Sequence, residues 1–222
     1  MAKNIAIDGP AGAGKSTIAK RIAKELGMIY VDTGAMYRAM GLFFHRQGID
    51  PQDEAAIGRE AENAQVTIRY ENGQQQVYLN GENVTARLRT EEAGQMASRV
   101  SVYPAVRRKL VWLQQQMAAS QDVVMDGRDI GTVVLPKADL KVYLTADSRV
   151  RAMRRVGELR EKGQECDLQE IERDIIERDY QDMHREESPL RQAEDAVLVD
   201  TSQMDIDQAV QAVVRLFQER VL

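Results

Sequence analysis

The 222-residue sequence has little cysteine, no long hydrophobic run and no excess of positive charge. Its one cysteine, Cys166, cannot form an internal disulfide, and its neighbours do not suggest a catalytic thiol. No apolar run approaches the length of a membrane-spanning helix, so we expect no membrane partner. The formal net charge of -5 argues against general affinity for nucleic acid, but it allows a local basic site for a small anion.

The sequence also predicts neither a signal peptide nor a metal-binding cluster of histidine and cysteine. The chain runs from Met1 directly into an apolar stretch, which leaves no room for a signal peptide, so we expect a soluble, cytoplasmic protein. His45 and His184 lie apart in polar helical stretches, and together with Cys166 they do not make a metal site. With 43% hydrophobic residues the chain can still bury a substantial core, and its length suits one domain with an insert.

The most informative segment that is present is a glycine-rich loop. Residues 9–16 match the spacing G-x-x-x-x-G-K-[ST] and follow a short apolar run. In this motif backbone N–H groups surround a phosphate, the lysine reaches the β- and γ-phosphates, and the hydroxyl holds Mg²⁺. A helix that begins there adds the positive end of its dipole. We predict a nucleoside triphosphate site formed by Gly9, Pro10, Ala11, Gly12, Ala13, Gly14, Lys15, Ser16 and Thr17, with magnesium at Ser16.

Strand and helix signals alternate along most of the chain. Apolar runs predict strands over residues 5–8, 28–32, 123–126, 140–144 and 196–199. Helical periodicity and end signals predict helices over residues 17–26, 33–47 (capped by Thr33), 53–64, 91–101, 104–119 and 206–220. This alternation is typical of an α/β fold with a doubly wound, five-stranded parallel sheet, which binds ligands beyond the carboxyl ends of its strands.

One segment departs from the alternation. Residues 66–70 alternate apolar and polar side chains, and Asn72-Gly73 and Asn80-Gly81 are hairpin turn signals, which together predict a small antiparallel β piece. We expect a single unit over 1–222. It consists of a core of about 1–32, 105–147 and 190–222, an acceptor-binding region with the insert of about 33–104, an arginine-rich lid of about 148–165, and a helix of about 167–187.

The segment after the second predicted strand carries candidate acceptor residues. Thr33 and Tyr37 are one helical turn apart, with Arg38 beside them. An arginine here can form two parallel hydrogen bonds to a phosphate. The same residues are compatible with a helix cap and a solvated arginine, and the sequence does not decide between these two interpretations.

The segment after the third predicted strand, residues 126–131, contains two carboxylates, an arginine and two glycines. Arg128 could hold a phosphate, while a carboxylate such as Asp129 could order Mg²⁺ water or accept a hydrogen bond from a base amino group. The alternative is a surface turn with a local salt bridge.

Arginines are concentrated further along the chain. Five occur between positions 149 and 160, among them Arg154 and Arg155, and they suit a mobile lid that neutralises phosphate charge or, alternatively, a soluble basic helix. Arg178, Asp182 and Arg185 are spaced to share one helix face, although Arg178 and Asp182 could form an ordinary ion pair within a helix.

Motifs of other phosphate-binding classes are missing. The guanine-reading Asn/Thr-Lys-x-Asp of GTPases and the His-Arg-Asp and Asp-Phe-Gly loops of protein kinases do not occur. A small-molecule kinase remains. If its acceptor is a phosphate, which is already anionic at pH 7, no general base is needed, and catalysis consists of positioning and charge neutralisation.

Along essentially its whole length the chain resembles the nucleoside monophosphate kinases, most closely the bacterial cytidylate (CMP) kinase family. The resemblance rests on Ile-Asp-Gly-Pro-x-Gly-x-Gly-Lys-Ser at the N-terminus, on residues 32–38 and 126–132, and on the tail from Glu177 to Leu190. Adenylate kinases usually have Asp where this chain has Ala35, and Asp-Gly-Phe-Pro-Arg where it has residues 126–129. Both differences favour cytidylate kinase.

The resemblance implies a role for each matched residue. It assigns the acceptor phosphate to Arg38, Arg128 and Arg185, the sugar to Arg178 and Asp182, and the cytosine to Ser98, Arg107 and Asp129. It implies ATP, CMP and dCMP as small-molecule partners, Mg²⁺ as cofactor, and a monomer. Two alternatives stay open: a kinase for another nucleotide or for a metabolite such as shikimate, and a nucleotide sensor without catalysis.

Overall fold

The structure is a computed structural model that describes residues 2–71, 73–161 and 163–221. The chain forms two compact units: unit 1 consists of Met1–Tyr30 and Ser120–Leu222, and unit 2 of Val31–Ala119. The sequence of unit 2 is therefore inserted into that of unit 1, and residues 105–119, which we assigned to the core, group with unit 2. The boundaries of the functional regions stay a prediction.

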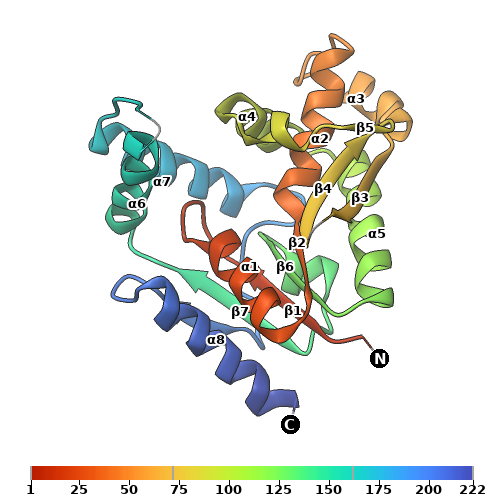
Figure 1. The fold of residues 1–222 in the computed structure, drawn as a ribbon. Coiled ribbons are helices and arrows are strands. Elements are labelled where there is room, and N and C mark those ends of the chain that lie inside the picture. Colours follow the sequence, from red (N-terminus) through yellow and green to blue (C-terminus); the bar gives the residue numbers. More distant parts are fainter. Residues whose placement is uncertain (1, 72, 162, 222) are drawn as a thin grey trace. The chain divides into compact units, whose positions relative to one another are not determined.

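A five-stranded sheet forms the centre of unit 1, although Val31 and Asp32, at the end of one edge strand, group with unit 2 (Figure 1). Its strands are β1 (Asn4–Asp8), β2 (Ile29–Asp32), β6 (Val123–Gly127), β7 (Leu140–Thr145) and β8 (Val197–Asp200). Their order is β2-β6-β1-β7-β8, and β1 pairs in parallel with both β6 and β7. Because β1, β6, β7 and β8 run parallel, their carboxyl ends lie at the same edge of the sheet. This confirms the predicted parallel sheet.

Helices α1 (Lys15–Leu26) and α8 (Ile206–Val221) pack against this sheet. The other two helices of unit 1, α6 (Ser148–Glu161) and α7 (Leu168–His184), pack against each other (Figure 1). Ile18 and Ile22 of α1 are buried with Val213 and Phe217 of α8 against Ile7 of β1. Complete burial of such a side chain contributes about 1.5–3 kcal/mol. This packing holds α1, and with it the start of the glycine-rich loop, at the middle of the sheet.

Unit 2 combines helices with a small antiparallel sheet. Its helices are α2 (Thr33–Arg46), α3 (Glu54–Glu60), α4 (Glu91–Val100) and α5 (Pro104–Ser120), with short 3-10 turns at Ala61–Asn63 and Thr85–Arg89. Its strands β3 (Val66–Glu71), β4 (Gln74–Leu79) and β5 (Glu82–Asn83) confirm the predicted insert. Asn80 and Gly81, with φ of 49° and 85°, form the second predicted turn. In the first, Asn72 lies outside the described residues.

Three predicted helix boundaries were wrong. Asp32, not Thr33, caps α2, because its carboxylate accepts the N–H of Ala35 at 2.9 Å, and Thr33 is the first helical residue. Helix α3 ends at Glu60, before the predicted limit of 64. Helix α7 ends at His184, so Arg185 stands one residue beyond it in an extended conformation, rather than on the helix face shared by Arg178 and Asp182.

Candidate functional site

The glycine-rich loop connects β1 to α1, and its conformation depends on glycine. Gly9 has φ 150°, and a Cβ on it would lie 1.9 Å from the carbonyl oxygen of Leu144 in β7. Gly12 and Gly14 have φ of 72° and 83°, in the left-handed region that other residues avoid. Gly14 is also the N-terminal cap of α1, so the loop leads directly into a helix whose first N–H groups favour an anion.

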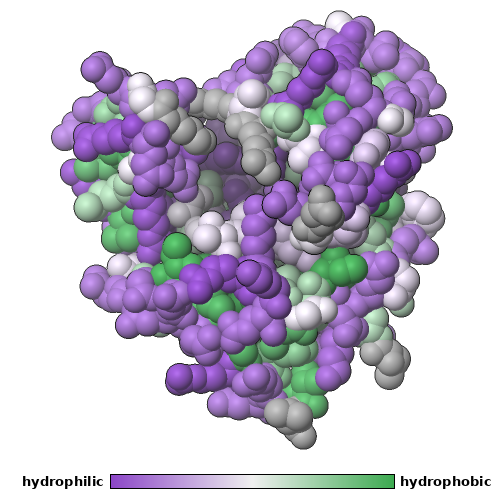
Figure 2. Space-filling model, viewed as in Figure 1, coloured by the Kyte–Doolittle hydropathy of each residue, from purple (hydrophilic) through white to green (hydrophobic). Residues whose placement is uncertain are grey.

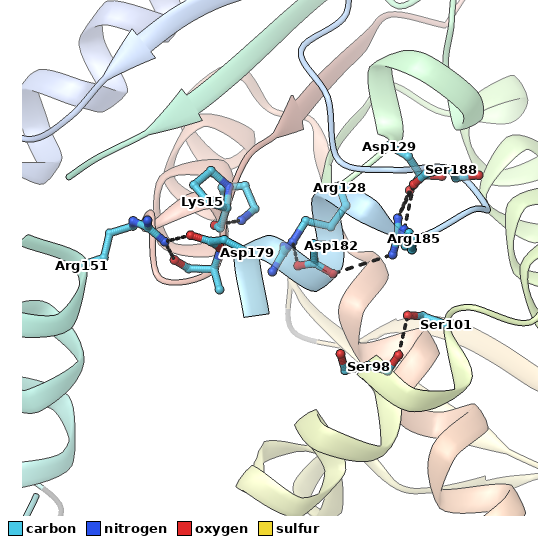
Figure 3. A network of polar contacts seen from close by, with 12 residues as sticks. Lys15, Ser98, Ser101, Arg128, Asp129, Arg151, Asp179, Asp182, Arg185 and Ser188 are labelled. Carbon is cyan, nitrogen blue, oxygen red and sulfur yellow. Dashed lines mark hydrogen bonds and ion pairs between the residues drawn. The ribbon is translucent and has the colours of Figure 1, made fainter. Parts of the chain in front are cut away.

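Lys15 is buried at the start of α1, with only 6% of its surface exposed. Its Nζ donates a hydrogen bond to the Pro10 carbonyl at 2.6 Å (Figure 3). Burial, assisted by the nearby Arg128, lowers the pKa of Lys15 to about 7, although Asp126, Asp182 and Asp8 act in the opposite direction. An anionic ligand beside the ammonium group would raise this pKa again. The side chain is therefore suited to bind a polyanion.

Ser16 follows Lys15 and contacts the end of β6. Its Oγ donates to Asp126 Oδ2 at 2.8 Å, and the Tyr30 hydroxyl donates to Asp126 Oδ1 at 2.8 Å. Hydroxyl and carboxylate oxygens are hard ligands of the kind that Mg²⁺ takes, usually one or two from the protein with water and phosphate supplying the rest. Within the described ranges, no group of three or more His, Cys, Asp or Glu residues could hold a metal by itself. The residues present thus fit a metal that arrives with a phosphate ligand.

Helices α6 and α7 hold the loop from the other side, through the backbone of Ala11. The Ala11 N–H donates to Asp179 Oδ1 at 3.0 Å, and the Ala11 carbonyl accepts from Arg151 Nη1 at 2.7 Å. The same Arg151 Nη1 lies 2.6 Å from Asp179 Oδ2 (Figure 3), and Arg151 Nε donates to the Ala146 carbonyl at 2.9 Å. Both charged side chains are buried. This closed ring fixes the orientation of a loop peptide.

Asp8, the last residue of β1, is buried beside the loop. Its two carboxylate oxygens accept the N–H groups of Ile130 and Gly131 at 2.8 and 2.7 Å. Burial raises the pKa of Asp8 to about 6, assisted by Asp129 and opposed by the two backbone hydrogen bonds and Lys15. The carboxylate therefore joins the start of the glycine-rich loop to the segment after β6.

That segment carries Arg128 and Asp129, which belong to a chain of alternating charges (Figure 3). Arg128 Nε donates to Asp182 Oδ2 at 2.7 Å, and Arg185 lies 3.9 Å from both Asp182 Oδ1 and Asp129 Oδ1. Arg185 also donates to the Ser188 carbonyl at 2.8 and 2.6 Å. This cluster contains two of the three arginines predicted to hold an acceptor phosphate.

The buried charges in this cluster stabilise one another. Burial alone would raise the pKa of Asp182, but Arg128, followed by Arg178 and Arg185, lowers it. Burial alone would likewise lower the pKa of Arg128, but Asp182 raises it. The carboxylate and the guanidinium are therefore both charged near neutral pH. Asp182 thus pairs with Arg128, a partner 54 residues away in the sequence that spacing within a helix could not indicate.

The arginines of α6 make separate contacts. Arg151 holds the loop. The two residues of this helix that were predicted to be catalytic are Arg154 and Arg155. Arg154 donates to the Thr201 carbonyl at 2.7 Å, and Arg155 lies 3.1 Å from Glu158. The prediction that they close over phosphates stays a prediction.

Unit 2 places its predicted residues on three helices. On α2, Thr33 is buried, and Arg38 Nη2 lies 3.0 Å from Asp32 Oδ2, the carboxylate that caps the helix. The buried Nε of Arg38 finds no hydrogen-bond partner among the residues that the structure describes. A buried N–H donor without a partner is costly, which favours a ligand that accepts from it.

The other predicted residues of unit 2 lie on α4 and α5. The Arg107 guanidinium stands over the Tyr37 ring, 5.5 Å from its centre, and donates to the Ser101 carbonyl at 3.1 Å. The Ser98 carbonyl accepts from the Ser101 hydroxyl at 2.9 Å. Tyr37, Ser98 and Arg107 are thus connected within unit 2 through direct contacts and Ser101.

Sequence reasoning did not select three residues that the structure brings to the loop: Asp8, Arg151 and Asp179. Arg151 was counted only as one of several lid arginines, and Asp179 only as part of a matching tail. A signal existed for Asp179, since it lies three residues before Asp182 on the same face of α7. For Asp8 the signal was an ionisable residue ending a strand that is otherwise apolar.

The face seen in Figure 2 is mainly hydrophilic, with hydrophobic residues in small groups. Among the described helices, none is both long and apolar enough to cross a membrane.

Comparison with known proteins gives consistent results. Residues 5–219 match the family model described as cytidylate kinase. The curated cytidylate kinase of Lactobacillus johnsonii is 48% identical over 97% of this chain and 94% of its own length, and that of Caldicellulosiruptor bescii is 48% identical over 98% and 96%. A solved structure of an uncharacterized protein from Eubacterium ventriosum shares the fold, with a TM-score of 0.56 at 11% identity over 98% of this chain and 99% of its own.

Proposed function

This chain belongs to the cytidylate kinase family, and we propose that it transfers the γ-phosphate of ATP to CMP, giving ADP and CDP, by positioning and charge neutralisation. The observation that carries this mechanism is the buried alternation of Arg128, Asp182, Arg185 and Asp129 in the same unit as Lys15. Two arginines held in place by carboxylates form an anion site that needs no rearrangement when charge spreads during transfer.

Residues 9–17 bind the phosphates of ATP through backbone N–H groups and the helix dipole. Lys15 releases the Pro10 carbonyl and donates to the phosphates, an exchange of a neutral acceptor for an anionic one. Ser16 and Asp126 would hold Mg²⁺, which would supply neutralisation of the phosphate charge during transfer. The Ala11 ring formed with Arg151 and Asp179 keeps the loop in the conformation that the phosphates require.

For CMP we propose the residues that the family resemblance implies. Arg38, Arg128 and Arg185 bind its phosphate, Arg178 and Asp182 its sugar, and Ser98, Arg107 and Asp129 its base, with Thr33 and Tyr37 supporting them. The unpartnered Nε of Arg38 supports the phosphate assignment. Cytosine presents an amino donor beside acceptors, so a carboxylate paired with an arginine suits its edge. Uracil puts an acceptor where that amino group was, which leaves the carboxylate unpaired.

No general base is required in this mechanism. The attacking oxygen belongs to a phosphate that is already anionic at neutral pH, so the protein has to align it with the γ-phosphate and exclude water. We propose that Arg154 and Arg155, on a lid of about 148–165, exchange Thr201 and Glu158 for the transferring phosphate. We expect a cytoplasmic monomer, in line with its resemblance to single-chain kinases.

One assay tests the function and separates its alternatives. ADP release is measured with ATP and Mg²⁺ across CMP, dCMP, UMP, AMP and shikimate, with Lys15→Ala as the control for contaminating kinases. We expect the highest kcat/KM with CMP or dCMP. Highest activity with shikimate would indicate a metabolite kinase, and ATP binding without release of ADP would indicate a sensor; either result would contradict the proposal.

A further inference from the structure

The turn after β6 is capped in an unusual way. A π-helical turn, Ile130–Val134, begins directly after Asp129, which occupies the N-terminal cap position with φ -144°. An Asp at this position ordinarily accepts the first free N–H groups of the turn with its own carboxylate. Asp129 makes no such hydrogen bond, and its Oδ1 instead lies 3.9 Å from Arg185. The N–H groups of Ile130 and Gly131 are bound by Asp8.

The use of Asp8 instead of Asp129 to bind these N–H groups has a cost in free energy. Asp8 is only 5% exposed, and burying a carboxylate is unfavourable even when it accepts hydrogen bonds. Asp129 stands next to the same N–H groups in the chain and could satisfy them without a second buried acid. The need to bind the free N–H groups of this turn therefore does not by itself explain why residue 8 is an acid.

The fit around Asp8 is also close. A Cβ added to Gly131 would lie 3.4 Å from Asp8 Oδ2 and 3.1 Å from Cδ of Lys141. The glycine thus allows its N–H to approach the carboxylate at 2.7 Å. Both oxygens of Asp8 are directed at one turn, so the position of that turn relative to β1 is fixed by two hydrogen bonds.

We propose that Asp8 is a positioning residue for the acceptor nucleotide. It caps the turn after β6 in place of Asp129, and so keeps the Asp129 carboxylate beside Arg185, in the position from which Asp129 contacts the base. This inference rests on the proposed function, since it assumes that Asp129 contacts the base of CMP. In the absence of the Asp8 carboxylate, the Asp129 side chain becomes the nearest acceptor for the N–H groups of its own turn and turns away from Arg185.

The test compares Asp8→Asn with Asp122→Asn in the full-length enzyme. Asp122, which directly precedes β6, is a matched control. Its carboxylate also accepts a backbone N–H, that of Lys3 at 2.7 Å, but it is exposed. With ATP saturating, we expect Asp8→Asn to raise KM for CMP about tenfold or more, since a hydrogen bond to a charged group is lost. We expect KM for ATP to change less than about twofold, and Asp122→Asn to match the wild type.

A double-mutant cycle shows whether Asp8 acts through Asp129. The loss of kcat/KM for CMP caused by Asp129→Asn should be clearly smaller in the Asp8→Asn background than in the wild type, because the two residues act in series. Additive losses would overturn the proposal, as would an unchanged KM for CMP in Asp8→Asn. If Asp8→Asn does not fold, Gly131→Ala, which displaces the same N–H without changing charge, should raise KM for CMP.

Different results would refute the kinase activity and the positioning role of Asp8. A wild-type enzyme that does not phosphorylate CMP would refute the proposed function. A wild-type enzyme that phosphorylates CMP, with Asp8→Asn and Gly131→Ala both retaining its KM for CMP, would refute only the positioning role of Asp8.

Discussion

Replacing Asp179 by Asn should destabilise the protein and weaken ATP binding together, because this side chain serves both an ion pair and the glycine-rich loop. Asn retains an oxygen that can accept the Ala11 N–H, but it removes the negative charge 2.6 Å from Arg151 Nη1. Removal of one partner of a buried ion pair ordinarily costs about 3–5 kcal/mol. Arg151 keeps its hydrogen bonds to two carbonyls, so we expect the lower end, ~3 kcal/mol.

For a chain of this length that loss corresponds to a decrease in melting temperature of about 6–12 °C, which calorimetry would measure. KM for ATP should rise while KM for CMP changes little. Asp207→Asn, which breaks the exposed pair with Arg21, is the control and should lower the melting temperature by less than about 4 °C.

A double variant distinguishes the ion pair from the loop contacts. Arg151→Met combined with Asp179→Leu removes both buried charges, so we expect it to be more stable than Asp179→Asn. Its KM for ATP should nevertheless stay high, since both the N–H and the carbonyl of Ala11 have lost their partners. The reasoning is refuted if Asp179→Asn melts within 2 °C of the wild type, or if the double variant restores KM for ATP.

Three further predictions follow from the site. Lys15→Ala should abolish phosphate transfer and leave the far-ultraviolet circular dichroism spectrum unchanged; near-normal turnover would contradict the donor site. Asp129→Ala should lower kcat/KM for CMP more than for UMP, and equal losses in a steady-state comparison would show that Asp129 does not read the base. Burial raises the pKa of Asp8 from 3.8 to about 6, so the folded protein binds a proton more tightly than the unfolded chain, and this group lowers the free energy of unfolding by about 2 kcal/mol as pH rises from 4 to 7. Urea unfolding across this range should show a decline that is smaller in Asp8→Asn than in the wild type, and parallel curves would contradict it.

The sheet and the glycine-rich loop could be predicted from the sequence because their signals are local. The apolar runs of β1, β6 and β7 and the turn at Asn80 and Gly81 depend on neighbouring residues only, and the family resemblance ordered them into one fold. The rule that ligands bind at the carboxyl edge of a parallel sheet indicated the segment after β6 as part of the site, and the structure places Asp126 of that segment beside Ser16.

Contacts between distant segments could not be predicted in the same way. Asp8 binds N–H groups 122 and 123 residues away, and Asp179 binds one 168 residues away, so no periodicity reports them. Arg185 illustrates a different failure. Its spacing from Asp182 fits a helix, but the chain leaves the helix after His184 because Ser188, with φ 51°, and the following Pro189 form a turn, which the Leu190 N–H closes onto the Asp182 carbonyl at 2.8 Å.

The close approach of Gly9 to the backbone of Leu144 limits how the sequence can vary. The neighbouring atom is a carbonyl oxygen in the middle of a parallel sheet, so no change of rotamer can make room for a methyl group. Gly27 and Gly48 also have positive φ, yet nothing lies within 4 Å of a Cβ on either, so Asn can replace them at a small conformational cost. A library of single substitutions should therefore leave position 9 as glycine alone, while positions 27 and 48 accept several residues. Tolerance to mutation thus separates glycines that serve only a turn, such as Gly27 and Gly48, from Gly9, which lets two backbones meet.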